Sequence, residues 1–86
     1  MSNPHKTLDR LLSGQADASL AFADLVRLLK KLGFASRTRG SHHIFYQTGI
    51  EEILNLQPKG SQAKPYQVRQ VRDVVLKYKL SLEKNV

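Results

Sequence analysis

Apolar residues recur along the first part of the chain at the spacing of two helices. Between residues 5 and 13, Leu8, Leu11 and Leu12 fall on one helical face, and Gly14 is a typical residue for ending such a helix. The polar stretch over residues 14–19 then predicts a linker. The sequence therefore opens with a short helix and a connection, ahead of a stronger helical pattern.

The second helix is predicted from Phe22 to Leu32. Lys30 and Lys31 suit the negative end of this helix, and Gly33 is the expected terminator. The positions that follow a 3.6-residue period are Phe22, Leu25, Val26, Leu28, Leu29 and Leu32. A last helix is predicted over residues 66–79, with Pro65 in its first turn. Its buried stripe consists of Val68, Val71, Val74, Val75 and Tyr78.

Three short strands are predicted between the second and the last helix. They cover residues 34–39, 42–47 and 53–56, with Gly40-Ser41 and Thr48-Gly49 as turns between them. Residues 57–64 contain proline, glycine and serine and predict a loop. The order helix, helix, three-stranded meander, helix is a two-layer α+β arrangement with the helices on one face of an antiparallel sheet. We therefore predict an αβββα domain over residues 20–80, preceded by an N-terminal extension (1–19) and followed by a C-terminal tail (81–86).

Composition narrows the class of protein. Eighty-six residues make one small domain, and a formal net charge of +7 on so small a body suits a phosphate backbone, an anionic membrane surface or an acidic partner protein. The chain has no cysteine, which excludes disulfides and thiolate metal sites and favours a reducing cytosol. No apolar run approaches the ~20 residues of a membrane span, and the first residues lack the apolar centre of a signal peptide.

The basic residues gather at two connected places. Arg37 and Arg39 are two apart on a predicted strand, so both side chains point to one face of the sheet. Lys59 and Lys64 bracket the loop that enters the last helix, and a helix start preceded by lysines favours phosphate. Arg69 and Arg72 are neighbours on that helix. Each cation alone is most simply a solvated surface residue, but together they favour nucleic acid.

Two adjacent histidines stand at the start of the second predicted strand. Histidine is the usual general acid or base near neutral pH. His42 and His43 must face opposite sides of the sheet, so they cannot share one role or bind one metal ion. Ile44 and Tyr46 share the face of His42, and Phe45 shares that of His43. Both faces carry apolar residues, so alternation leaves open which one is the core, and either histidine could be a structural surface residue.

Other chemistries find less support in the sequence. Glu51 and Glu52 adjoin in a predicted turn, without the convergence that glycoside hydrolysis or Mg²⁺ binding requires. There is no glycine-rich phosphate loop. Ser41 precedes His42, but neighbours in a strand face apart and no orienting acid is evident. Three functions stay open from the residues: a ribonuclease, a non-catalytic RNA-binding module, and a subunit that binds an acidic protein.

Two sequence blocks resemble a known family. Leu32-Gly33-Phe34 followed by Arg39-Gly40-Ser41-His42-His43-Ile44-Phe45 resembles the HicA toxins of bacterial HicA–HicB toxin–antitoxin modules. The segments 52–60 and 64–74 resemble a longer subgroup of that family. The chain differs from many members in the residues before its core helix. It also has Gln57-Pro58-Lys59-Gly60 where many members have a histidine-containing turn.

The resemblance implies a fold similar to double-stranded-RNA-binding domains and cleavage of mRNA independent of the ribosome. Because the 2′-hydroxyl of RNA is a built-in nucleophile, this cleavage requires no metal, and we expect no cofactor and a bacterial cytoplasmic location. The resemblance also implies neutralisation by a HicB-like antitoxin. The family's functional histidine directly follows the Gly-Ser pair, so the resemblance assigns catalysis to His42 and not to His43. We expect RNA contacts from the following residues: Arg37, Arg39, Ser41, Lys59, Lys64 and Arg69.

Overall fold

The computed structural model describes residues 3–82 and places helices and strands in the predicted order. The elements are α1 (Pro4–Ser13), α2 (Phe22–Lys31), β1 (Ala35–Arg39), β2 (His42–Gln47), β3 (Ile50–Leu56), β4 (Pro58–Lys59), β5 (Gln62–Ala63) and α3 (Pro65–Lys77). Most of the predicted C-terminal tail, residues 83–86, lies outside the described residues, as do residues 1–2. Within residues 3–82, no helix is both long and apolar enough to cross a membrane.

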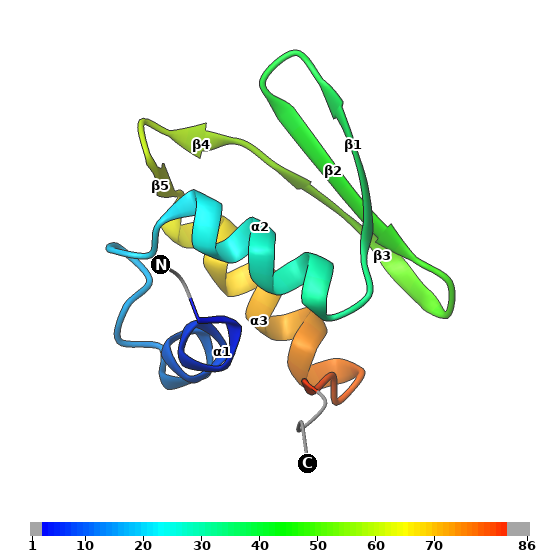
Figure 1. Cartoon of the computed structure of the whole chain (residues 1–86), viewed down its shortest axis with the longest axis horizontal. Helices are drawn as coiled ribbons and strands as arrows, with labels where there is room; N and C mark the ends of the chain where they lie inside the picture. The colour runs from blue at the N-terminus through cyan, green and yellow to red at the C-terminus, as the bar shows by residue number, and fades with distance from the viewer. Residues whose placement is uncertain (1–2, 83–86) are drawn as a thin grey trace.

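The three main strands form an antiparallel sheet in the order β1-β2-β3. Helices α2 and α3 lie on one side of this sheet, and α1 packs on the helices rather than on the sheet (Figure 1). The predicted α+β class with an αβββα arrangement and an extra N-terminal helix is therefore confirmed. The sheet has two distinct faces, one turned to the helices and one turned to solvent.

The face of the sheet that forms the core is the one that carries Phe45. This ring is fully buried, as are Leu25 and Leu28 of α2 and Val68 and Val71 of α3. These helix positions are three or four residues apart, which is the spacing that builds one apolar stripe. Because side chains alternate along a strand, His43 lies on the core side and His42 on the solvent side. The structure thus decides a question that the alternation of apolar residues left open.

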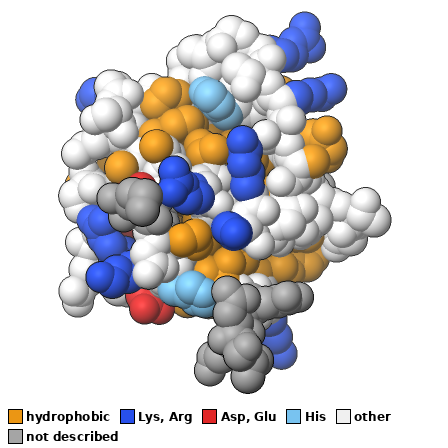
Figure 2. Space-filling model, viewed as in Figure 1, with side chains coloured by type: hydrophobic (Ala, Val, Ile, Leu, Met, Phe, Trp, Pro, Cys, Tyr) orange, Lys and Arg blue, Asp and Glu red, His pale blue; other side chains and the backbone are white. Residues whose placement is uncertain are grey.

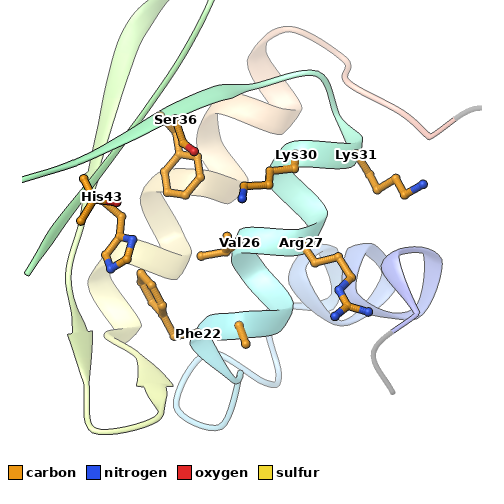
Figure 3. A pocket seen from close by; sticks show the side chains of 10 residues that line it. Phe22, Val26, Arg27, Lys30, Lys31, Ser36 and His43 are labelled. Carbon is orange, nitrogen blue, oxygen red and sulfur yellow. The ribbon is translucent and has the colours of Figure 1, made fainter.

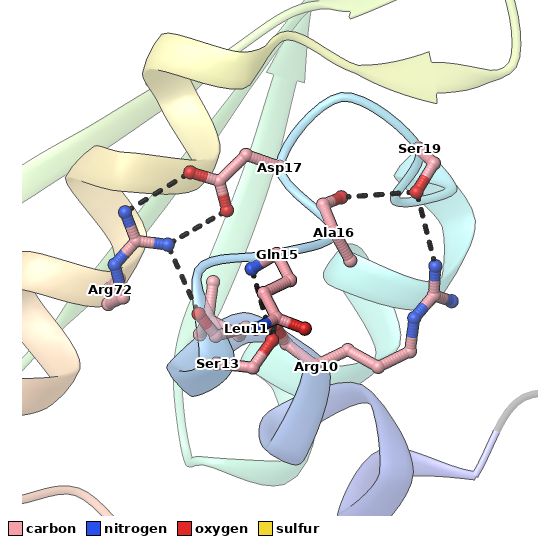
Figure 4. A network of polar contacts seen from close by, with 8 residues as sticks. All are labelled: Arg10, Leu11, Ser13, Gln15, Ala16, Asp17, Ser19 and Arg72. Carbon is pink, nitrogen blue, oxygen red and sulfur yellow. Dashed lines mark hydrogen bonds and ion pairs between the residues drawn. The ribbon is translucent and has the colours of Figure 1, made fainter.

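The N-terminal segment shares the same core. Leu11 of α1 is fully buried in it. The guanidinium of Arg72 on α3 donates to both carboxylate oxygens of Asp17 at 2.8 and 3.1 Å, and to the carbonyl oxygen of Leu11 at 3.1 Å (Figure 4). The hydrogen bond from Arg72 holds the pKa of Asp17 below its ordinary value. Arg72 therefore connects the N-terminal extension to α3, and its positive charge forms a salt bridge with Asp17.

Several boundaries differ from the predictions. Helix α3 ends at Lys77 rather than at 79, and β1 begins at Ala35 rather than at 34. The larger differences lie in β3 and in the segment that follows it. Strand β3 begins at Ile50 rather than at 53, because Ile50 pairs with Gln47 across the turn, and the register then shifts between Phe45 and Gln47. The predicted loop 57–64 contains the short hairpin β4–β5. This hairpin is held by backbone bonds to the start of α2, from Ala63 N–H to the Leu20 carbonyl (2.9 Å) and from Phe22 N–H to the Ser61 carbonyl (3.0 Å). Such pairings join distant segments, so local sequence patterns do not reveal them.

Candidate active site and nucleic-acid interface

The solvent face of the sheet brings His42 together with two arginines. In the antiparallel register, Arg39 lies directly opposite His42, and Arg37 lies opposite Ile44. Residues paired in this way project from the same face. The prediction that Arg37 and Arg39 share a face is therefore confirmed, and His42 shares it with them. His42 and both arginines are exposed, so a bound polyanion can reach all three.

His42 is the first residue of β2, directly after the turn at Gly40 and Ser41. Its ring nitrogen Nδ1 lies 3.0 Å from the side-chain oxygen of Asn55 on the neighbouring strand β3. The opposite ring nitrogen, Nε2, has no hydrogen-bond partner among the described residues. One edge of the ring is thus held by the protein, while the other is available to a ligand.

A chain of amide hydrogen bonds connects this site to the core. The Gln57 side chain donates to the Ser41 hydroxyl at 2.9 Å. The backbone N–H of Gln57 donates to the side-chain oxygen of Gln67 at 3.1 Å, and the Gln67 side-chain NH₂ donates to the Asn55 carbonyl at 3.4 Å. Gln67 is only 4% exposed, on the face of α3 that also buries Val71. Asn55 is therefore bonded directly to the buried Gln67, and Ser41 is linked to Gln67 through Gln57.

Sequence reasoning missed Asn55, Gln57 and Gln67. One feature of the sequence could have indicated Gln67: it is a polar residue at a core position, one helical turn before Val71 on the buried stripe. A buried amide must find hydrogen-bond partners, and here those partners are the end of β3 and the residue that follows it. No local pattern identifies which distant backbone groups those partners are.

The remaining predicted RNA contacts lie at different distances from this face. Lys59 is exposed on β4, two residues after Gln57, and Lys64 precedes α3 one turn before Gln67. Arg69 is two residues beyond Gln67, so it projects from the opposite side of α3. Its charge contributes to the lowered pKa of Asp17, which places it near the N-terminal segment. The structure thus brings Arg37, Arg39 and Ser41 to His42, and it separates Arg69 from them.

Positive charge is also spread beyond the predicted residues. Lys and Arg side chains are scattered over the view in Figure 2, with little acidic surface between them. Three further cations, Arg27, Lys30 and Lys31, line an open groove of about 730 Å³ between α2 and the β1–β2 hairpin (Figure 3). Sequence reasoning took the two lysines as helix-end residues and did not assign them to a surface.

His43 faces this groove rather than the solvent face of the sheet. It is half-buried, and its ring packs edge-on against Phe22, with ring centroids 4.9 Å apart and an interplanar angle of 63°. The prediction that the two histidines face opposite sides is confirmed. His43 has a packing role that explains its presence, whereas within residues 3–82 no aromatic ring packs on His42 in this way. Within residues 3–82, no three His, Asp or Glu side chains converge as ligands for a metal ion.

Comparison with protein families identifies a family for most of the chain. The family model described as the HicA toxin of bacterial toxin–antitoxin systems matches residues 22–78, which is more than half of the chain. The matched region begins with α2 and ends just after α3, so it contains the whole sheet and excludes α1. Neither the comparison with curated proteins nor the comparison with solved structures finds a match.

Proposed function

Because the chain belongs to the HicA toxin family of bacterial toxin–antitoxin systems, we propose that it is an endoribonuclease that cleaves mRNA, with His42 as the group that transfers a proton. As a member of this family the protein is the toxin of such a system, and an antitoxin is its partner. We propose that this partner is HicB-like and that both act in the bacterial cytoplasm.

The reaction needs few groups because RNA carries its own nucleophile. The 2′-hydroxyl oxygen attacks the adjacent phosphorus, the bond from phosphorus to the 5′ oxygen breaks, and a 2′,3′-cyclic phosphate and a 5′-hydroxyl form. A base must take the proton of the 2′-hydroxyl, an acid must protonate the departing oxygen, and cations stabilise the charge on phosphorus. We assign one of the two proton transfers to His42, and the chemistry requires no metal ion.

The observation that carries this proposal is the position of His42 beside Arg39. The two residues are cross-strand partners on the exposed face of the sheet, so a phosphate bound by the guanidinium lies next to the imidazole. An arginine guanidinium also matches phosphate geometry with two parallel N–H groups. We propose that Arg37, Arg39 and Ser41 bind the scissile region, and that Lys59, Lys64 and Arg69 bind more distant phosphates.

The experiment compares two histidine variants on single-stranded RNA in the presence of a chelator. We expect His42→Ala to lower the cleavage rate by about 10²- to 10⁴-fold, the usual contribution of a general acid or base. His43→Phe is the matched control, because it removes the neighbouring imidazole but keeps an aromatic ring against Phe22. This control should cleave at close to the parent rate and leave cyclic phosphate ends.

Three results would contradict the proposal. Equal cleavage by His42→Ala and the parent would remove His42 from the reaction. Loss of cleavage in His43→Phe alone would move the reaction to the groove. Salt-sensitive binding of intact RNA by all three proteins, with no cleavage by the parent, would instead support a non-catalytic RNA-binding module.

A further inference from the structure

The contact between His42 and Asn55 specifies where the imidazole carries its proton. Asn55 pairs with Ile44 on β2, so it is the diagonal neighbour of His42 on the solvent face of the sheet. Its side-chain oxygen lies 3.0 Å from Nδ1 of His42. An amide oxygen only accepts hydrogen bonds, so Nδ1 must be the donor. In the neutral ring, the lone pair then resides on Nε2.

A buried side chain of α3 holds the backbone of Asn55 in place. Its carbonyl oxygen accepts from the buried Gln67 side chain at 3.4 Å, and the same side chain accepts from the Gln57 backbone. Gln57 in turn donates to Ser41, immediately before His42. The bond from Gln67 holds the backbone of Asn55, and the side-chain oxygen of Asn55 contacts His42. Here the strand end that carries it is attached to α3 on one side and to the β1–β2 turn on the other.

The groups that face His42 make an amide a suitable partner. Arg39 lies opposite on β1 and Arg37 two residues further along it, while on β3 the nearest ionisable residue of this face is Glu51, four residues from Asn55. Lys59 follows on β4. An amide oxygen orients the ring without a negative charge that would hold the imidazolium proton. Asn55 therefore orients the ring without forming an ion pair with it.

We propose that Asn55 is a positioning residue for His42: it holds the Nδ1 proton and so makes Nε2 the nitrogen that exchanges a proton with the RNA. The role of Nε2 in proton exchange with RNA rests on the proposed function. The proton on Nδ1 is a property of the free protein and can be tested without any RNA. We assign Asn55 no contact with the substrate or with the reacting atoms.

The first test is NMR of the imidazole nitrogens in the free protein, with the ring in its neutral form. We expect long-range ¹⁵N–¹H correlations to show the His42 proton on Nδ1 in the parent. In Asn55→Ala the Nδ1 tautomer should lose its predominance. Ile53→Ala is the matched control, since Ile53 is 65% exposed on the same face of β3 and two residues away, and it should leave the tautomer unchanged. A proton on Nε2 in the parent, or no change in Asn55→Ala, overturns the inference.

The second test measures cleavage of single-stranded RNA against pH. Asn55→Ala should lose about 10- to 100-fold in rate through misplacement of the ring. Asn55→Asp keeps an acceptor oxygen in place and should recover most of that rate. Its carboxylate favours the imidazolium, so its pH profile should move to higher pH. A merely structural role for Asn55 would change the rate without moving the profile.

The two proposals fail in different ways. If His42→Ala cleaves as well as the parent, the proposed function fails whatever the tautomer is. If His42→Ala is inactive but Asn55→Ala cleaves like the parent, His42 stays catalytic and the positioning role of Asn55 is wrong.

Discussion

His42 and His43 are adjacent in β2 but have different surroundings, because the buried ring of Phe45 turns one face of the strand toward the core. Phe45 is fully buried, so the side chains on its face of β2, including His43, point to the helices. His42 projects to the other side, beside Arg39 and Asn55. Strand alternation predicted that the two rings separate, but it did not predict which one would be free to meet a substrate.

Gly33 is another residue whose role depends on a distant partner. It follows the C-cap residue of α2 and has φ = +99°, a backbone conformation that residues with a side chain rarely adopt. A Cβ atom at this position would collide with the amide nitrogen of Gln47. That amide donates to the Leu32 carbonyl at 3.0 Å, so it caps the end of α2 from β2.

We therefore predict that Gly33→Ala lowers the free energy of unfolding by about 1–3 kcal/mol through backbone strain, with a further loss because Gln47 must move. The measurement is urea denaturation. Gly49→Ala is the matched control, because Gly49 has φ = +89° but, apart from its own chain neighbours, no atom of residues 3–82 lies within 4 Å of the added Cβ. A loss in Gly33→Ala no larger than that in Gly49→Ala would contradict a role for Gln47.

Among the elements, the start of β3 and the end of α3 are joined by a carboxylate. Glu52 accepts from the Lys77 ammonium at 2.8 Å and from the Tyr78 hydroxyl at 2.6 Å. These two hydrogen bonds, Lys77 first, lower the pKa of Glu52 from its ordinary 4.5 to about 2. The sequence predicted a turn at Glu51 and Glu52. The strand extends to Ile50 through its pairing with Gln47, and the partners of Glu52 lie on and directly after α3; local apolar patterning encodes neither contact.

This pKa shift predicts a pH dependence of stability. Because the pKa of Glu52 is lower in the folded protein, its contribution is complete above about pH 4.5 and is lost as the pH falls towards 2. We expect Glu52→Gln to be less stable than the parent at pH 7 and to lose less stability between pH 4.5 and 2, as measured by urea midpoints at several pH values. Glu51→Gln removes the same charge from an exposed neighbour and should follow the slope of the parent. If stability falls equally steeply with pH in Glu52→Gln and in the parent, the link between Glu52 protonation and stability is wrong.

For the whole molecule, the arrangement in two layers separates two basic surfaces. The solvent face of the sheet carries Arg37, Arg39 and His42, and the groove on the helix side carries Arg27, Lys30 and Lys31. The net charge of +7 predicted a polyanionic partner. The charge alone could not say whether binding depends on overall attraction or on one face.

A salt titration separates these possibilities. On single-stranded RNA, each phosphate contact changes the slope of log K against log[salt] by about 0.7. With the His42→Ala background to prevent cleavage, we expect Arg39→Gln to reduce the slope by about that amount in a fluorescence anisotropy titration. Arg10→Gln on α1 removes the same charge far from the sheet face and should leave the slope nearly unchanged. Equal reductions in both variants would indicate binding by overall charge rather than by the sheet face.

The sequence by itself determined the order of the three helices and the three main strands, the antiparallel class, the shared face of Arg37 and Arg39, and the family resemblance that the family match bears out. These features depend on local periodicity, on turn residues such as Gly40 and on contiguous motifs. Only the tertiary structure decided which face of the sheet is buried, how far β3 extends, and which groups hold His42. These depend on contacts between residues far apart in the chain, such as Asn55 with His42 and Gln67 with Gln57, and a local pattern carries no information about such pairs.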